Sequence, residues 1–229
     1  VDRLHIRKYG AHGTSHRYIW RTAHEFLKGE VHRLVSCHLG SGASLSAIKD
    51  GQDMDTTMGL TPLDGLIMGT RCGSIDPATV CYLVREGGYT IDEVDTMMNK
   101  QSGLRALSAV SSDSRDIEEA AENGDKNCQM ALDMFCYRTG QLIAEMAQSM
   151  HGFDAMAFSA GIGENSDILR AGIARELGWL GVALDPEKNK LRSDDPHIIS
   201  TDDSKVKVLV VPTNEELMIA FDVEELLHS

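Results

Sequence analysis

The chain has 229 residues, a length that fits one large domain or two small ones and excludes a small disulfide-held scaffold. Its 22 Lys and Arg residues against 35 Asp and Glu residues give a net charge of −13, which argues against binding to nucleic acid or an anionic membrane surface. The hydrophobic share of 42% is that of an ordinary globular protein, and five scattered cysteines without a Cys-x-x-Cys pair indicate reduced thiols and a cytoplasmic location.

The first third of the chain predicts a helix followed by two strands. Thr14 or Ser15 can cap a helix that runs to about Lys28, with apolar residues at helical spacing. Residues 33–39 form an apolar run that predicts a buried strand, and residues 44–49 predict its hairpin partner.

The middle of the chain predicts a long loop and three helices. Residues 58–74 are rich in glycine and small side chains without a regular period, and ordered loops of this length are usually functional. Asp76-Pro77 begins one helix, residues 90–100 form a second, and residues 125–150 form a long third helix. One face of the long helix carries Met130, Met134, Tyr137, Gln141 and Ala144.

The last third predicts two strands and two helices. Residues 153–159 read as a central strand, and a glycine loop at 161–165 leads into a helix over 167–177. A strand over 206–211, far too short to span a membrane, leads into an acidic helix over 215–227. Strands that alternate with helices, with one hairpin among them, predict an α/β fold with a mixed central sheet flanked by helices.

His12 and His16 are four residues apart, the spacing that places two imidazoles on one helix face in zinc proteases. The glutamate of that motif is missing and no third ligand is evident, so a metal site is disfavoured and a loop before the helix is the better interpretation. His12 can project from such a loop into a cleft. A surface histidine with an ordinary backbone contact is the alternative, which this segment alone does not exclude.

Two glycine-containing segments could hold a phosphate. His38-Leu39-Gly40-Ser41-Gly42 follows a predicted strand, although a simple hairpin turn explains this segment better when it is taken alone. Gly161-Ile162-Gly163-Glu164-Asn165 lies between a strand and a helix, where ligands of α/β sheets gather. Neither matches Gly-x-Gly-x-x-Gly, and the absence of a Gly-x-x-x-x-Gly-Lys-Ser/Thr sequence excludes a P-loop enzyme.

An arginine and a pair of acidic residues complete the candidates. Arg71 lies between Gly69 and Gly73, where a free backbone can aim the guanidinium at a carboxylate or phosphoryl group. Glu215 and Glu216 could supply a carboxylate to Mg²⁺, although acidic residues in a first helical turn are normally explained by the helix dipole.

Taken together, five segments closely resemble motifs of the acetate kinase family: residues 9–16, 37–42, 61–73, 158–165 and 213–216. Their order across the whole chain makes a chance match negligible. The resemblance implies a ribonuclease H-like, actin-like ATPase fold and a homodimer. It also implies reversible phosphoryl transfer from ATP to acetate, giving acetyl phosphate and ADP.

The resemblance also implies roles for individual residues. His12 and Arg71 would stabilise the transition state and, with Mg²⁺ or Mn²⁺ bound by Glu215, would supply positive charge in this acidic chain. Ala11 and Pro62 would line the acyl pocket. The residues that would hold ATP or ADP are His38, Leu39, Gly40, Ser41, Gly42, Asp113, Ser114, Arg115, Gly161, Ile162, Gly163, Glu164 and Asn165.

Members of the family are longer than this chain. Their first domain bears a phosphate loop, an arginine that binds the acyl carboxylate and the active-site aspartate, and none of these is found here. The resemblance therefore implies that residues 1–229 are the carboxyl-terminal nucleotide-binding and dimerisation domain, with 213–229 as a terminal helix that packs on the missing domain. In isolation such a domain would bind nucleotide without catalysing the reaction.

Two positions depart from the family pattern. Ala11 stands where the family usually has a phenylalanine, whose ring lines the pocket for the acetate methyl group. A smaller side chain could enlarge the pocket, so a propionate or butyrate kinase is the alternative. Ser41 stands where asparagine is common, which shortens the side chain but keeps a hydrogen-bonding group.

Overall fold

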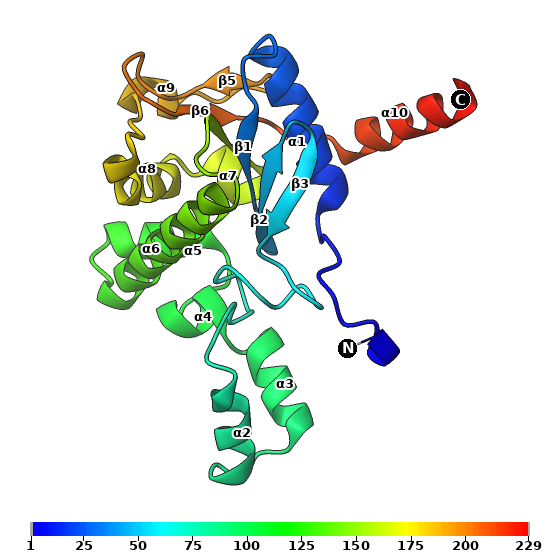
Figure 1. The fold of residues 1–229 in the computed structure, drawn as a ribbon. Helices are drawn as coiled ribbons and strands as arrows, with labels where there is room; N and C mark the ends of the chain where they lie inside the picture. Colours follow the sequence, from blue (N-terminus) through cyan, green and yellow to red (C-terminus); the bar gives the residue numbers. More distant parts are fainter. Residues whose placement is uncertain (1, 229) are drawn as a thin grey trace.

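The computed structural model describes residues 2–228, so Val1 and the last residue of the expected terminal segment, Ser229, lie outside the described residues. At its centre is a mixed six-stranded sheet in the order β3-β2-β1-β4-β6-β5 (Figure 1). The strands are β1 (Arg33–Leu39), β2 (Ala43–Lys49), β3 (Gln52–Thr56), β4 (Ala155–Ser159), β5 (His197–Ile198) and β6 (Lys207–Val210). The central strands β1, β4 and β6 are parallel, and the other pairings are antiparallel, which confirms the expected mixed sheet.

Helices surround this sheet and extend beyond it (Figure 1). They are α1 (Gly13–Phe26), α2 (Ala78–Arg85), α3 (Ile91–Lys100), α4 (Gly103–Ser108), α5 (Ser114–Glu122), α6 (Lys126–Ser149), α7 (Ala160–Asn165), α8 (Asp167–Glu176), α9 (Pro186–Asn189) and α10 (Glu215–His228), with 3-10 turns η1 (Asp2–Leu4) and η2 (Gly178–Leu180). Helices α2 and α3 form an exposed hairpin below the sheet, and α10 projects away from the body. Every helix within residues 2–228 is too short or too polar to cross a bilayer. A cytoplasmic location stays a prediction.

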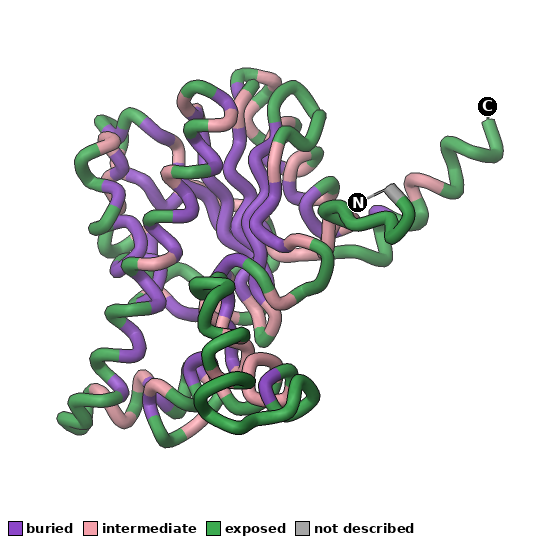
Figure 2. The backbone as a smooth tube through the Cα atoms, turned by 60° about the horizontal axis from the view of Figure 1, so that its bottom comes forward, coloured by how far each residue is buried: buried purple, intermediate pink, exposed green. Residues whose placement is uncertain are grey.

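The sheet separates two apolar cores because neighbouring residues of a strand point to opposite faces. Leu34 of β1 packs in a small core with Ile19 and Ala23 of α1. Its neighbour Val35 belongs to a larger core that includes Phe135 of α6. Figure 2 shows the resulting concentration of buried residues in the central strands. The ends of β1, β2 and β4, which lead into the candidate site, therefore belong to strands that are buried on both faces.

Most predicted elements are confirmed to within one or two residues. Helix α3 begins with a reciprocal capping box that Thr90 and Glu93 form. Asp125 caps α6 by accepting hydrogen bonds from the next backbone N–H groups. The face of α6 with Met130, Met134 and Tyr137 is solvent-exposed, while the opposite face packs in the core.

Two local predictions are wrong. The first helix is not capped by Thr14 or Ser15: it begins at Gly13, after His12 in the left-handed conformation with φ 59°, and the Ser15 hydroxyl binds other side chains. The glycine loop at 161–165 is instead the short helix α7, whose six residues are too few to show helical periodicity.

Candidate active site

Three histidines meet where α1 begins beside the ends of β1 and β2. The rings of His12 and His38 stack with centroids 4.1 Å apart, and the His16 ring lies 6.5 Å from the first and 6.3 Å from the second. Strand pairing contributes to this cluster because His38 of β1 stands opposite Ser44 of β2. The left-handed backbone at His12 is uncommon for a residue other than glycine, and such conformations concentrate at functional sites.

Serine hydroxyls hold each of these rings. Ser44 Oγ lies 2.8 Å from His12 Nδ1 and 2.8 Å from His16 Nε2. The other nitrogen of His16, Nδ1, lies 2.8 Å from Ser36 Oγ. Hydroxyls from two strands therefore link His12 to a second imidazole beneath it.

The third ring has its own serine. His38 Nδ1 lies 2.8 Å from Ser15 Oγ, which in turn lies 3.1 Å from Thr213 Oγ1. Since Thr213 lies two residues before the start of α10, this contact ties the segment that leads into that helix to the histidine cluster.

The three imidazoles are neutral at physiological pH. Burial, with a smaller contribution from His38, lowers the pKa of His16 to about 3, and burial lowers the pKa of His38 to about 4. The pKa of His12 is also lowered, mainly by burial, against the opposing effect of the Glu215 carboxylate. The lowered pKa favours the neutral ring of His12 in the unliganded chain, and the expected positive charge of His12 beside bound nucleotide stays a prediction. Its imidazole is a neutral hydrogen-bonding group.

Arg71 supplies the cation of this region. It comes from the long loop over residues 58–74, and its Nη1 donates to the Pro62 carbonyl oxygen at 3.1 Å. A Cβ atom placed on Gly42 would lie 3.2 Å from Arg71 Nη1 and 3.7 Å from His12 Nε2. Gly42 is thus the point at which both expected transition-state residues converge, and its missing side chain leaves the space open.

A cavity of about 600 Å³ lies beside this convergence point. It is lined by Gly40, Ser41, Gly69, Ser112, Asp113, Ser114, Arg115, Glu118, Gly161, Ile162, Asn165 and Ser166. The cavity brings together most of the residues that the sequence assigned to the nucleotide, although they come from three distant segments.

Four lining residues were missed. Gly69 belongs to the glycine frame of Arg71, and its N–H donates to the Ser41 carbonyl at 3.3 Å. Ser112 directly precedes Asp113. Its carbonyl oxygen lies so close to Gly69 that a Cβ atom added to Gly69 would be 3.1 Å from it. Glu118 and Ser166 carry no sequence signal for a nucleotide site, and their side chains bond to each other at 2.7 Å.

Some assigned residues lie elsewhere. The Leu39 side chain is fully buried in the large core, so only its backbone is available to a ligand. Gly163 packs against Phe158 behind the cavity. Glu164 Oε1 accepts hydrogen bonds from the backbone N–H of Ala160 at 2.7 Å and of Thr213 at 3.0 Å, so it positions backbone. His38 and Gly42 face the histidine cluster and Arg71.

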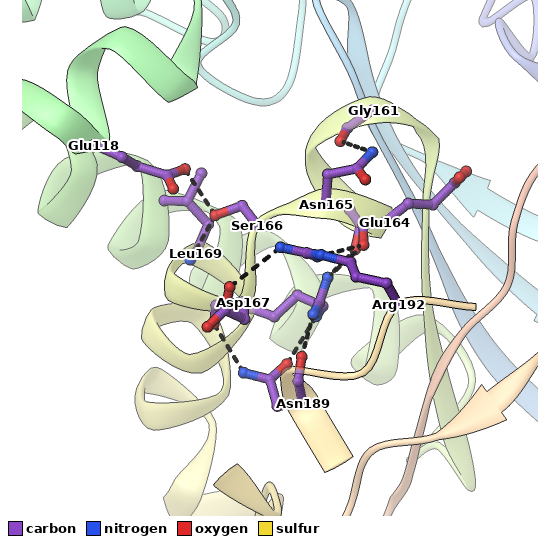
Figure 3. A network of polar contacts seen from close by, with 11 residues as sticks. Glu118, Gly161, Glu164, Asn165, Ser166, Asp167, Leu169, Asn189 and Arg192 are labelled. Atoms are coloured by element: carbon purple, nitrogen blue, oxygen red, sulfur yellow. Dashed lines mark hydrogen bonds and ion pairs between the residues drawn. The ribbon is translucent and has the colours of Figure 1, made fainter. Parts of the chain in front are cut away.

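A buried arginine holds the back of α7. Arg170 is fully buried, and its Nη1 donates to the carbonyl oxygens of Gly163 and Glu164, both at 2.9 Å. Its Nε donates to Asn189 Oδ1 at 2.8 Å and its Nη2 to the Asn189 carbonyl. Figure 3 shows the surrounding network, in which Arg192 donates to the same Glu164 carbonyl at 3.0 Å. Burial lowers the pKa of Arg170 to about 10, so it stays charged at neutral pH.

Acidic residues contribute at two edges of the site. Asp113 pairs with Arg115 at 2.6 Å, and hydrogen bonds from that guanidinium lower the pKa of Asp113 to about 2. Glu215 is exposed at the first turn of α10 and acts electrostatically on His12. No group of three side chains within residues 2–228 is arranged to hold a metal ion. Mg²⁺ commonly takes one or two carboxylates together with phosphate oxygens and water, so Glu215 fits as one such ligand.

Comparisons with known proteins point to a single family. The family model described as the acetokinase family matches residues 1–221. Acetate kinase 2 of Clostridium perfringens is 52% identical over 223 residues, which cover 96% of this chain and 56% of that protein. The acetate kinase of Oleidesulfovibrio alaskensis is 51% identical, with 96% and 55% covered. The chain therefore spans little more than half the length of these relatives.

Solved structures show the same likeness in the fold. The acetate kinase of Porphyromonas gingivalis aligns with a TM-score of 0.94 and 38% identity, over 99% of this chain and 57% of that one. A propionate kinase from Francisella tularensis aligns with a TM-score of 0.89 and 40% identity, over 95% of this chain and 56% of that one. These matches confirm the expected fold class, and the chain belongs to the acetokinase family.

Proposed function

We propose that this chain is the nucleotide-binding and dimerisation domain of an acetate kinase, which transfers a phosphoryl group reversibly from ATP to acetate. The observation that carries the proposal is the convergence of Arg71 Nη1 and His12 Nε2 on Gly42, beside a cavity of about 600 Å³. Since the chain spans 56% of its relative from Clostridium perfringens, the remaining groups of the active site belong to another part of the subunit.

The cavity suits the adenosine part of the nucleotide, and the glycines at its inner end suit the phosphates. Gly40 and Gly69 present backbone without side-chain obstruction, and Asp113 and Arg115 form a fixed pair at the outer edge. A nucleotide held there by its adenosine directs its terminal phosphate toward Gly42. Bound Mg²⁺ or Mn²⁺, held by Glu215 and by the phosphates, would neutralise part of their charge.

The chemistry then needs little from the protein beyond position and charge. A carboxylic acid is ionised at neutral pH, so acetate attacks without a general base. Phosphoryl transfer passes through a loose transition state with charge on the equatorial oxygens of the phosphoryl group. Arg71 compensates that charge with its guanidinium, and His12 donates a hydrogen bond from its neutral ring.

A propionate kinase is the second candidate, and Ala11 is the observation that favours it. Its methyl side chain is half-buried against the large core, in a position where the family usually has a phenylalanine ring. One of the similar solved structures bears the name propionate kinase. Pro62, the other expected pocket residue, is held near Arg71 through its carbonyl.

The test is trapping of acyl phosphate with hydroxylamine in the full-length protein, with acetate, propionate and butyrate as alternative substrates. We expect ATP-dependent product with acetate and a smaller but measurable rate with propionate. A rate that is highest with propionate or butyrate replaces the first candidate by the second. Absence of product with all three acids, while the protein binds ADP in calorimetry, leaves only a nucleotide-binding function.

The exposed face of α6 supports a homodimer. Met130, Met134 and Tyr137 are 46%, 40% and 56% exposed although they are large and apolar, and such faces usually meet a partner. We expect the wild-type protein to sediment as a dimer and Met134→Glu to sediment as a monomer.

The terminal helix has a similar exposed face. Ile219, Val223 and Leu227 of α10 are exposed, while Arg17 forms a two-point ion pair with Asp222 that fixes the helix to α1. We infer that this face packs on the further part of the subunit.

A further inference from the structure

Ser36 is the far end of a chain of hydrogen bonds that ends at His12. This chain runs from Ser36 Oγ through the His16 ring and Ser44 Oγ to His12 Nδ1, with every contact at 2.8 Å. Ser36, His16 and Ser44 are 0%, 4% and 0% exposed, so solvent contributes little to their hydrogen bonds. The donors and acceptors along this series of hydrogen bonds can be arranged in two opposite directions. The direction decides which ring nitrogen of His12 bears the hydrogen.

In the first direction, Ser36 accepts a hydrogen bond from His16 Nδ1. Ser44 must then donate to His16 Nε2, because a neutral imidazole has one N–H. The single hydrogen of Ser44 is thereby used, and His12 must donate from Nδ1. Nε2 of His12, the atom next to Gly42, would then be a bare acceptor and would repel a phosphoryl oxygen.

In the second direction, the Ser36 hydroxyl donates to His16 Nδ1. His16 then carries its hydrogen on Nε2 and donates to Ser44, which donates in turn to His12 Nδ1. His12 is left with its hydrogen on Nε2. That N–H lies beside Gly42, where Arg71 also points.

Burial of Ser36 selects the second direction. Within residues 2–228, Ser36 Oγ has a single hydrogen-bond partner, which is His16 Nδ1. In the first direction its own hydrogen would be buried with no acceptor, whereas in the second only lone pairs are left over. Buried donors without a partner are rarer in proteins than under-used acceptors, because a buried donor that loses its partner bears the full cost of desolvation.

We propose that Ser36, His16 and Ser44 are positioning residues that fix His12 as the neutral Nε2–H tautomer, so that it presents a hydrogen-bond donor to the transferred phosphoryl group. This inference rests on the proposed function for the identity of the acceptor. The proton arrangement itself follows from burial and hydrogen bonding. His12 thus donates without being charged, and the net charge at the site stays with Arg71.

The arrangement is measured directly by NMR of the full-length protein labelled with ¹⁵N at histidine, since the two ring nitrogens of each tautomer have distinct chemical shifts. We expect His12 and His16 both as neutral Nε2–H tautomers at pH 7. A hydrogen on Nδ1 of either ring overturns the proposal. Because this readout needs no substrate and no variant, it stands even if the protein fails to phosphorylate acetate.

Kinetics tests whether the tautomer matters to the reaction. Ser44→Ala removes the link between the rings, and we expect kcat to fall about 10- to 100-fold while the nucleotide KM changes less than about twofold, as for other supporting hydrogen bonds. Ser44→Thr retains the hydroxyl and should restore most of kcat. Equal losses in the two variants, or none in Ser44→Ala, contradict the proposal.

A matched control is available on the same strand. Ser46 is also buried on β2, but its hydroxyl donates to Asp53 at 2.6 Å and has no link to His12. Ser46→Ala therefore removes a buried hydroxyl but leaves the hydrogen bonds from Ser36 to His12 in place, and we expect kcat to be retained. A loss as large as that of Ser44→Ala means that general damage to β2 explains both, and this result overturns the positioning role.

Discussion

The two sides of the site are each backed by a buried polar network, and the networks differ in kind. Beneath His12, neutral imidazoles alternate with hydroxyls, and each link has a donor end and an acceptor end. Behind α7, Arg170 is a fixed cation that donates to backbone carbonyls and to Asn189. This contrast fits the proposed function, in which a side chain near the reacting atoms needs its proton placed, whereas a segment that shapes a cavity needs only its backbone held.

Substitution of Arg71, where the two sides of the site meet, should reduce activity most. Arg71→Ala should lower kcat about 10³- to 10⁵-fold, equivalent to about 4–7 kcal/mol, because the charge of the transferred group loses its guanidinium. Steady-state kinetics of the full-length protein measures this loss, and circular dichroism checks that the fold persists. Arg71→Lys keeps the charge without the planar fork and should be intermediate. Near-normal turnover in Arg71→Ala contradicts the assignment.

The two networks should differ in how their contribution to the unfolding free energy depends on pH. The pKa of His16 is about 3 in the folded chain against 6.5 when unfolded, so between these values the unfolded state binds the additional proton. Stability therefore falls as pH drops from 6.5 toward 3, by up to about 1.4 kcal/mol per pH unit for this group. Arg170 keeps its charge throughout this range and adds no such dependence.

Urea unfolding between pH 7 and pH 4.5 measures this dependence. In His16→Gln the slope of unfolding free energy against pH should be smaller by up to about 1.4 kcal/mol per unit. His5→Gln, which alters an exposed imidazole, is the control and should retain the slope of the parent. If the parent and His16→Gln have the same slope, His16 does not sit in the folded protein as a neutral buried group.

Substitution of Arg170 tests the network behind α7, on the side of the site proposed for the nucleotide. Arg170→Met should lower the unfolding free energy by about 1–3 kcal/mol, since it removes the Arg170 donor from the carbonyls of Gly163 and Asn189 and one of the two arginine donors from the carbonyl of Glu164. The nucleotide KM should rise more than kcat falls, because α7 lines the cavity proposed for the nucleotide. Arg192→Met removes the exposed arginine that donates to the Glu164 carbonyl. It should change the unfolding free energy and the nucleotide KM much less. A selective loss of kcat in Arg170→Met would put this arginine with the chemistry instead.

The smallest effect concerns the acyl pocket. Ala11→Phe should increase discrimination against propionate relative to acetate, by no more than the ~1–3 kcal/mol that one methylene is worth in such pockets. The ratio of kcat/KM for the two acids measures it, with an unchanged nucleotide KM as the control. If the parent already discriminates as strongly as the variant, Ala11 does not enlarge the pocket.

Strong local patterns made most of the fold predictable. β1 and β4 are apolar runs, and α6 has a cap at Asp125 and a length of several turns. The short elements could not be predicted in the same way, because α7 has six residues and α4 has six, too few to show a period. Their conformations are set by contacts with distant segments, such as the Glu164 carboxylate on Ala160.

The site was predictable only for residues within motifs. His12, Arg71 and Gly42 stand in recognisable segments, and the structure brings them together. Ser36 carries no chemical signal in the sequence, because its contact with His16 depends on how α1 packs on the sheet. Arg170 likewise reads as an ordinary helix cation, and only its burial distinguishes it.

The Glu164 carboxylate has a mechanical consequence. One oxygen atom of this side chain receives both the Ala160 and the Thr213 backbone N–H, so the first residue of α7 and the segment that leads into α10 share one attachment. If α7 moves when nucleotide enters the cavity, the shared oxygen would move the Thr213 backbone with it, and Glu215 lies two residues beyond Thr213. The cavity beside α7 and the proposed metal carboxylate are therefore connected mechanically through a single side chain.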